Sequence, residues 1–123
     1  MSGTKWTVLV VDDNEGLQEA VRTVFDDEFE VLACSSGEGA VVLAGGSANG
    51  IRVVLLDDQL GSLHGADILP RLKKLLPAAS VIMTGSLMQP AQAGLGQYSD
   101  VVAVLPKPWN VVELRATVRG LCS

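Results

Sequence analysis

The sequence has few residues of several kinds, and each shortage excludes a class of protein. Its 123 residues include one histidine and two widely separated cysteines, Cys34 and Cys122, too few for a zinc cluster or a disulfide framework. Nine basic residues against fourteen acidic ones give a net charge of −5, which argues against direct nucleic-acid binding. Aromatic residues make up 4% of the chain, so the core must consist of aliphatic side chains.

Long apolar stretches are missing as well. No run approaches the ~18 residues that can cross a membrane, and the N-terminal stretch MSGTKWTVLVVDD has no signal-peptide organisation. We therefore expect a cytoplasmic protein without membrane association. The length of 123 residues and the hydrophobic content of 48% fit one globular domain with a single core.

Short apolar runs alternate along the chain with stretches of helical periodicity. The runs rich in Val, Ile and Leu predict five strands, at residues 5–11, 29–34, 51–56, 80–83 and 101–105. Apolar residues three and four apart predict helices at about 15–25, 37–44, 68–76 and 111–121. Strands that are apolar on both faces are typical of a parallel sheet between two helical layers, so we expect a doubly wound α/β domain.

Polar and small residues indicate where the helices begin and end. Asn14, Ser36 and Asn110 precede three of the helical patterns and are predicted N-caps. The Gly-Gly-Ser stretch at 45–47 is predicted to end the second helix. Residues 86–98 carry the weakest pattern and predict a short helix at best.

Polar side chains follow the apolar runs at four of the five predicted strand ends. These side chains are Asp12, Asp13, Asp57, Thr84 and Lys107. Because ligands bind at the carboxyl ends of the strands in doubly wound sheets, we expect all of them to converge there. Taken singly, each has a simpler structural interpretation, as a helix cap, a strand end or a surface charge. Only the set indicates a site.

This set of groups suits phosphoryl transfer to an aspartate. Clustered carboxylates repel one another unless a cation neutralises them, and oxygen ligands favour a hard divalent ion, Mg²⁺ or Mn²⁺. With Asp57 as the nucleophile, the ion, the Thr84 hydroxyl and the Lys107 ammonium would share the charge of the phosphoryl oxygens.

Four stretches occur in order at the strand ends: VLVVDDN, VVLLDDQLGSLHG, VIMTGS and LPKPW. At these residues the sequence resembles the receiver domain of bacterial two-component response regulators, and the resemblance covers the whole chain. It implies a flavodoxin-like five-stranded parallel sheet with strand order 2-1-3-4-5 and helices on both faces. It also implies that residues 1–123 form a single receiver domain, with no output domain in this chain, that regulates an unknown downstream protein or output domain.

The resemblance assigns roles in phosphoryl transfer. Asp57 would accept the phosphoryl group from the phosphohistidine of a sensor histidine kinase or phosphotransfer protein. Thr84 would bond to the phosphoryl group and Lys107 would pair with it. The domain would assist its own phosphorylation and dephosphorylation without being an enzyme for another substrate.

The resemblance also implies a set of metal ligands for Mg²⁺ or Mn²⁺. Asp13 and Asp57 would ligate the ion directly, and Asp12 would act mainly through water. The backbone carbonyl of Gln59 would provide a further ligand.

Three positions depart from the usual receiver pattern. Gly61 stands where receivers usually have proline, so we expect a looser loop after the phosphoacceptor. Gly85 follows Thr84 in place of the usual alanine, and Val104 occupies the position of a Tyr or Phe whose ring reports phosphorylation. We therefore expect residues 85–99, and not the Val104 side chain, to reorder on phosphorylation.

Two polar residues close to Asp57 are interpreted as having no part in the chemistry. Asp58 is expected to be solvent-exposed. His64, the only histidine, is expected to be a loop residue that neither binds a metal nor donates a phosphoryl group.

Two other functions remain open at this stage. An aspartyl-phosphate hydrolase of the haloacid dehalogenase type uses similar groups, but it needs a second Asp two residues after its nucleophile, where this chain has Gln59. A receiver-like docking module that never becomes phosphorylated usually lacks an acidic, Thr/Ser or Lys position, and all are present here. Hydrolysis of small phosphate esters would indicate the former, and failure to incorporate a phosphoryl group the latter.

Overall fold

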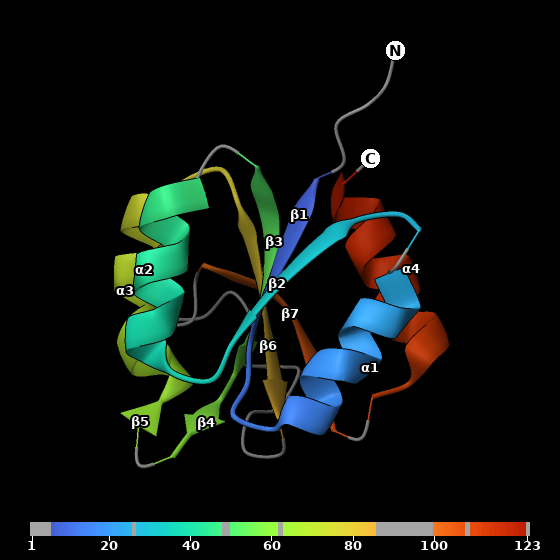
Figure 1. Ribbon diagram of the computed structural model, residues 1–123, viewed down its shortest axis with the longest axis horizontal. Coiled ribbons are helices and arrows are strands. Elements are labelled where there is room, and N and C mark those ends of the chain that lie inside the picture. Colours follow the sequence, from blue (N-terminus) through green and yellow to red (C-terminus); the bar gives the residue numbers. More distant parts are fainter. Residues whose placement is uncertain are drawn as a thin grey trace.

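A computed structural model describes residues 6–25, 27–47, 50–61, 63–85, 100–107 and 109–122. Within them, helices cover both faces of a five-stranded parallel sheet (Figure 1). In spatial order the strands are β2 (Glu30–Cys34), β1 (Thr7–Val11), β3 (Ile51–Asp57), β6 (Ser80–Gly85) and β7 (Val101–Pro106). Numbered along the chain within this sheet, the order is 2-1-3-4-5, which confirms the predicted fold class.

The helices form two outer layers (Figure 1). The bounds are Glu15–Phe25 for α1 and Val111–Cys122 for α4 on one face, and Gly37–Ser47 for α2 and Gly65–Leu75 for α3 on the other. A separate antiparallel hairpin of β4 (Gln59–Leu60) and β5 (Leu63–His64) connects β3 to α3. None of the helices among the described residues has the length and apolarity needed to span a bilayer.

The central strands are buried on both sides because their alternating side chains enter two separate clusters. In β1, Leu9 and Val11 pack on the side of α2 and α3, whereas Val8 and Val10 pack on the side of α1 and α4. All four side chains are fully buried. Burial on both faces explains why these strands read as continuous apolar runs. It also makes the central strands a rigid base for the side chains at their ends.

The three predicted N-caps are present. The accepting side chains are those of Asn14, Ser36 and Asn110, and each receives the N–H of the residue three positions later, at 3.2, 3.0 and 3.0 Å. Each cap therefore satisfies one of the N–H groups that a helix N-terminus leaves unpaired.

The second helix ends within the predicted Gly-Gly-Ser stretch, but later than the predicted bound of about residue 44. α2 continues through the glycine pair to Ser47. Gly45 and Gly46 are not among the glycines with positive φ, so neither forms a left-handed cap. Ala40 and Ala44 are fully buried on the inner side of the helix, and this packing holds the helical path through the glycines.

The third helix begins earlier than predicted, at Gly65 rather than near Ile68. His64, which was expected to be a loop residue, ends β5 and immediately precedes this helix. Its N–H donates to Asp67 Oδ2 at 3.3 Å, a bond that closes the first turn. Residues 86–98, for which a short helix at best was predicted, lie outside the described residues.

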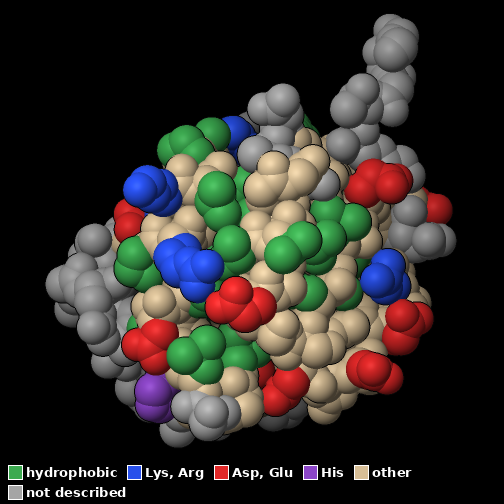
Figure 2. Space-filling model, turned by 60° about the vertical axis from the view of Figure 1, so that its left-hand side comes forward, with side chains coloured by type: hydrophobic (Ala, Val, Ile, Leu, Met, Phe, Trp, Pro, Cys, Tyr) green, Lys and Arg blue, Asp and Glu red, His purple; other side chains and the backbone are tan. Residues whose placement is uncertain are grey.

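α2 has an unusually uncharged surface. Its one charged residue, Glu38, pairs with Arg71 of α3 at 3.4 Å. Val42 is 73% exposed, and a side chain at Gly45 or Gly46 would meet only open space. Figure 2, turned to bring this side forward, shows hydrophobic side chains lying between charged ones. Because an exposed ion pair contributes ~1 kcal/mol at most, α2 depends mainly on packing against the sheet and α3.

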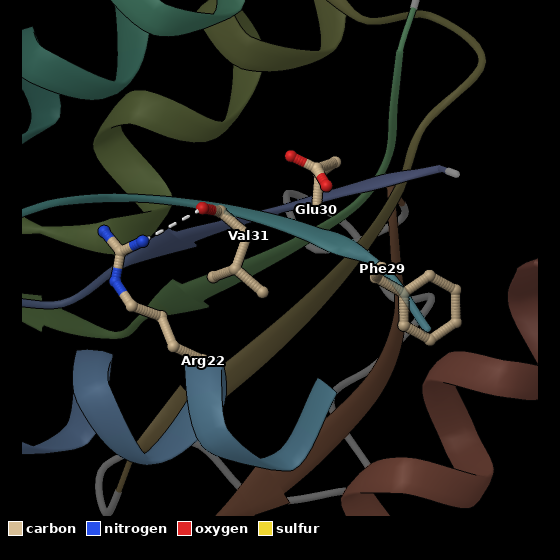
Figure 3. Close-up of a pocket in the computed structure, with 4 residues that line it drawn as sticks. All are labelled: Arg22, Phe29, Glu30 and Val31. Atoms are coloured by element: carbon tan, nitrogen blue, oxygen red, sulfur yellow. Dashed lines mark hydrogen bonds between the residues drawn. The ribbon is translucent and has the colours of Figure 1, made fainter. Parts of the chain in front are cut away.

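Arg22 covers part of the free edge of the sheet. Its Nη1 donates to the Val31 carbonyl at 3.2 Å, beside Phe29 and Glu30 (Figure 3). β2 is an edge strand, and unpaired carbonyls at an edge can pair with a strand from another molecule. The guanidinium group therefore opposes edge-to-edge association at this position.

The two tryptophans lie at opposite ends of the parallel strands. Trp6 precedes β1, at the amino-terminal ends of the strands. It is 44% exposed, and the Arg52 guanidinium lies 5.4 Å from its ring centroid. Trp109 follows β7 at the carboxyl edge, two residues after Lys107, and packs against the core on the α1–α4 side. Its buried indole N–H has no hydrogen-bond partner among the described residues.

Candidate functional site

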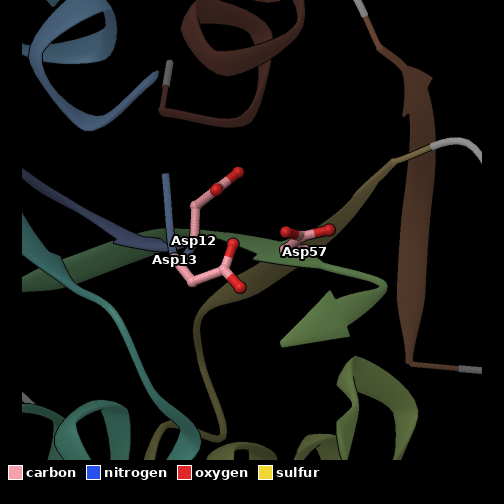
Figure 4. A group of neighbouring side chains, drawn as sticks. All are labelled: Asp12, Asp13 and Asp57. Carbon is pink, nitrogen blue, oxygen red and sulfur yellow. The ribbon is translucent and has the colours of Figure 1, made fainter. Parts of the chain in front are cut away.

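Three aspartates meet at the carboxyl ends of the neighbouring strands β1 and β3. Asp12 and Asp13 follow β1, and Asp57 ends β3. One carboxylate oxygen from each lies within 4.8 Å of the others, and Figure 4 shows the three side chains grouped at this edge. Asp12 and Asp57 are 1% and 5% exposed, whereas Asp13 is open to solvent. The structure thus brings the predicted carboxylates together, in an all-oxygen arrangement suited to a hard divalent ion.

Lys107 joins this cluster from the end of β7. Its Nζ lies 2.7 Å from Asp12 Oδ2 and 3.1 Å from Asp57 Oδ2. The lysine side chain is 23% exposed, so the ammonium group is partly withdrawn from water. One positive charge therefore compensates two buried carboxylates.

Burial and hydrogen bonding act in opposite directions on the charges of this cluster. Burial raises the pKa of Asp57 and prevails over the opposing bonds from the Gln59 N–H and the Lys107 ammonium. For Lys107, burial acts to lower the pKa, but the bonds to Asp12 and Asp57 together outweigh it, so that the pKa is raised. A further cation close to Asp57 would therefore stabilise the charged form of its carboxylate.

Thr84 and Gln59 both lie beside Asp57. Thr84 is the register partner of Asp57 in the β3–β6 ladder and is 1% exposed. The Gln59 N–H donates to Asp57 Oδ1 at 3.2 Å. Bonding of Thr84 to a phosphoryl group and ligation of a metal by the Gln59 carbonyl stay predictions.

Asp58 is buried, so the prediction that it is solvent-exposed is wrong. The residue is 9% exposed, and its carboxylate fills the space that a Cβ atom at Gly85 would occupy. Gly85 has a φ of +136°, which residues with side chains rarely adopt. The Asp58 N–H donates to the Thr84 carbonyl at 2.8 Å and links the two strand ends. In the sequence, the one indication of this burial was Gly85 itself, because glycine in place of the usual alanine leaves space for a neighbouring side chain such as Asp58.

Asp13 is tied to the hairpin loop by a bond that sequence reasoning missed. Its Oδ2 accepts the N–H of Gly61 at 3.3 Å, across a separation of 48 residues. Gly61 follows β4 and has a φ of +62°, in the left-handed region. The Gln59 side chain donates to the Gly61 carbonyl at 2.8 Å. Periodicity carries no information about such a contact, because the fold alone brings the two segments together.

Val104 is 8% exposed and packs in the core on the side of α2 and α3. Apart from Gly85, the segment 85–99 lies outside the described residues. The expectation that this segment reorders in place of an aromatic ring stays a prediction.

Residues 8–119 match the sequence model of the response regulator receiver domain. The hydrogenase transcriptional regulatory protein HoxA of Cupriavidus necator is 32% identical over 121 residues, which cover 97% of this chain and 24% of HoxA. HoxA of Bradyrhizobium diazoefficiens is 32% identical over 115 residues, which cover 92% of this chain and 23% of that protein. The chain thus spans about a quarter of the length of these relatives.

A crystal structure supports the same comparison at the level of the fold. The response regulator receiver domain protein from Clostridium thermocellum superposes with a TM-score of 0.82 and 26% sequence identity. The superposition covers 94% of this chain and 93% of that one.

Proposed function

The chain belongs to the response regulator receiver domains of two-component signalling systems, and from this we propose that Asp57 accepts a phosphoryl group. The donor would be a phosphohistidine on a sensor histidine kinase or phosphotransfer protein. The observation that carries the proposal is the setting of the Asp57 carboxylate, within 4.8 Å of Asp12 and Asp13 and 3.1 Å from Lys107. These are the groups that phosphoryl transfer to a carboxylate requires.

In the proposed step, a carboxylate oxygen of Asp57 attacks phosphorus while the bond from phosphorus to the donor imidazole nitrogen breaks. The imidazole keeps the electron pair of that bond and takes up a proton, and Asp57 becomes an acyl phosphate. Lys107, which is bonded to Asp57 before the reaction, would then pair with the phosphoryl oxygens. Thr84, the neighbour of Asp57 on β6, would donate its hydroxyl hydrogen to one of them.

Asp12, Asp13 and Asp57 would hold Mg²⁺ or Mn²⁺, together with the backbone carbonyl of Gln59. Three carboxylates against one ammonium leave a formal charge of −3 + 1 = −2, which a divalent ion balances. When bound, the ion supplies Lewis-acid stabilisation of charge on the phosphoryl oxygens.

The phosphorylated domain would act on a downstream protein or an output domain, in the cytoplasm and without direct binding to nucleic acid or membranes. We propose that residues 85–99 carry the change of shape. Val104 is buried, too short to sweep between two positions, and stiff at χ1, so it is unsuited to the role of a moving ring.

Incubation with acetyl phosphate or a phosphorylated kinase should add one phosphoryl group at Asp57, and only with a divalent ion present. Mass spectrometry of the intact protein and its peptides measures both the number and the position. Asp57→Asn should abolish incorporation. Asp100→Asn is a matched control, because Asp100 is exposed and immediately precedes β7, at the opposite edge of the sheet; it should behave like the wild type.

Other outcomes would favour other functions. A phosphoryl group on His64 or Ser86 would overturn the assignment of Asp57. No incorporation under any of these conditions would favour a docking module. Multiple-turnover release of phosphate from small esters would favour a hydrolase.

A further inference from the structure

The two carboxylate oxygens of Asp13, the exposed member of the aspartate cluster, have different surroundings. Asp13 Oδ2 accepts the N–H of Gly61 at 3.3 Å. Asp13 Oδ1 accepts no hydrogen bond from the residues that the structure describes. One oxygen is therefore engaged by the protein, and the other is available to a ligand.

The Gly61 N–H, which donates to Asp13, is held in place by the hairpin of β4 and β5. Leu60 is 6% exposed and packs in the core on the side of α2 and α3, which anchors β4. Gln59 pairs with His64 and Leu60 with Leu63 across the hairpin. The Gln59 side chain also donates to the Gly61 carbonyl at 2.8 Å. Both sides of the Gly61 residue are thus bonded, its N–H to Asp13 and its carbonyl to the hairpin.

This arrangement uses two properties of glycine. The φ of +62° lies in the left-handed region, and the N–H is the donor. Proline at this position could supply neither, because its ring fixes φ at about −65° and it has no N–H. A side chain at position 61 would meet open space, so asparagine, which tolerates left-handed backbone, would keep both the bend and the donor.

We propose that the Gly61 N–H is a positioning group that restricts Asp13 to one ligand oxygen and thereby favours Mg²⁺ over Ca²⁺. This inference rests on the metal site of Asp12, Asp13 and Asp57 proposed above. Mg²⁺ requires a near-octahedral shell of short bonds, whereas the larger Ca²⁺ readily takes carboxylates through both oxygens. With Oδ2 engaged by Gly61, Asp13 presents Oδ1 alone, which suits the smaller ion.

The test is calorimetric titration of the wild type, Gly61→Pro and Gly61→Asn with Mg²⁺ and separately with Ca²⁺. Gly61→Pro should weaken Mg²⁺ binding roughly tenfold, the low end of the effect of outer-shell partners on metal affinity. It should weaken Ca²⁺ binding less, so that the ratio of the Ca²⁺ Kd to the Mg²⁺ Kd falls. Gly61→Asn should keep the ratio of the wild type.

The outcomes separate this inference from the metal site itself. If the wild type binds Mg²⁺ and Gly61→Pro shows the same ratio of Kd values, the positioning role is overturned. An equal fall of the ratio in Gly61→Asn would assign the effect to the loop backbone and also overturn it. If the wild type does not bind Mg²⁺, the metal site fails, and the inference fails with it.

A second measurement keeps the inference testable if proline disturbs the fold of the loop. In the metal-free protein, NMR-detected hydrogen exchange should show a protected Gly61 amide. Asp13→Ala should speed its exchange severalfold, because the acceptor is lost. Exchange at the same rate in both proteins would show that the bond does not hold in solution and would overturn the inference.

Discussion

Replacement of Lys107 by alanine is expected to destabilise the metal-free protein by about 3 kcal/mol. The lysine Nζ bonds to Asp12 at 2.7 Å and to Asp57 at 3.1 Å, and its removal leaves two buried carboxylates without their cation. Removing one partner of a buried ion pair costs about 3–5 kcal/mol. The Lys107 side chain is 23% exposed, so water can reach the cluster and the lower end of that range applies.

The same geometry predicts that a second substitution at Asp57 reduces this loss. Burial raises the pKa of Asp57, so the folded state disfavours its charged form. Because the folded pKa is raised above the unfolded one, stability falls as the pH rises from the unfolded pKa to the folded pKa. Asparagine carries no charge and avoids that loss. Metal-free Asp57→Asn should therefore have a larger free energy of unfolding than the metal-free wild type. The double variant Lys107→Ala with Asp57→Asn should likewise be more stable than Lys107→Ala alone.

Urea unfolding at neutral pH, with EDTA and then with excess Mg²⁺, measures these differences. Mg²⁺ should reduce the loss in Lys107→Ala, because it replaces the missing positive charge. Lys74→Ala, at an exposed position of α3, is the control and should stay within about 0.5 kcal/mol of the wild type. Two results would refute the reasoning: a Lys107→Ala protein as stable as the control, or strictly additive effects of the Lys107 and Asp57 substitutions.

Glycine replacements at two positions should change stability in opposite directions, which urea unfolding can also check. Gly85→Ala should cost about 1–3 kcal/mol, because its φ is +136° and the methyl group would displace the buried Asp58 carboxylate. Gly46→Ala should add about 0.5–1 kcal/mol, because this helical position is open; a reversed sign at either site would contradict the structure. The Cys34 thiol should react slowly with Ellman's reagent, since burial raises its pKa to about 11. If the reaction rate, measured against pH, already levelled off near pH 9, the ordinary pKa of a cysteine thiol in this comparison, the result would be inconsistent with that burial.

Much of the fold could be predicted because the central strands are buried on both faces. That burial demands continuous apolar runs, and the runs mark β1 and β3 in the sequence. Parallel pairing then carries the residues after each run to one edge, so Asp12 and Asp57 could be placed together before the structure was known.

The features that escaped prediction depend on packing between segments that are distant in the sequence. The helical path through Gly45 and Gly46 follows from buried alanines, against the ordinary preference of glycine for helix ends. The burial of Asp58 depends on the empty space at Gly85, on a neighbouring strand. Local patterns describe one segment at a time and cannot show such contacts.

The placement of the two tryptophans gives the domain an optical signal and an optical reference in one spectrum. Trp109 is partly buried and follows Lys107 by two residues in the sequence, so its emission should lie to the blue, and we expect it to change when the charge around Lys107 changes. Trp6 is 44% exposed at the far edge of the sheet, so it should emit to the red and be quenched first by acrylamide. Trp6→Phe would leave Trp109 as the single tryptophan emitter. Binding at the acidic edge could then be followed in unlabelled protein, by wavelength as well as by intensity.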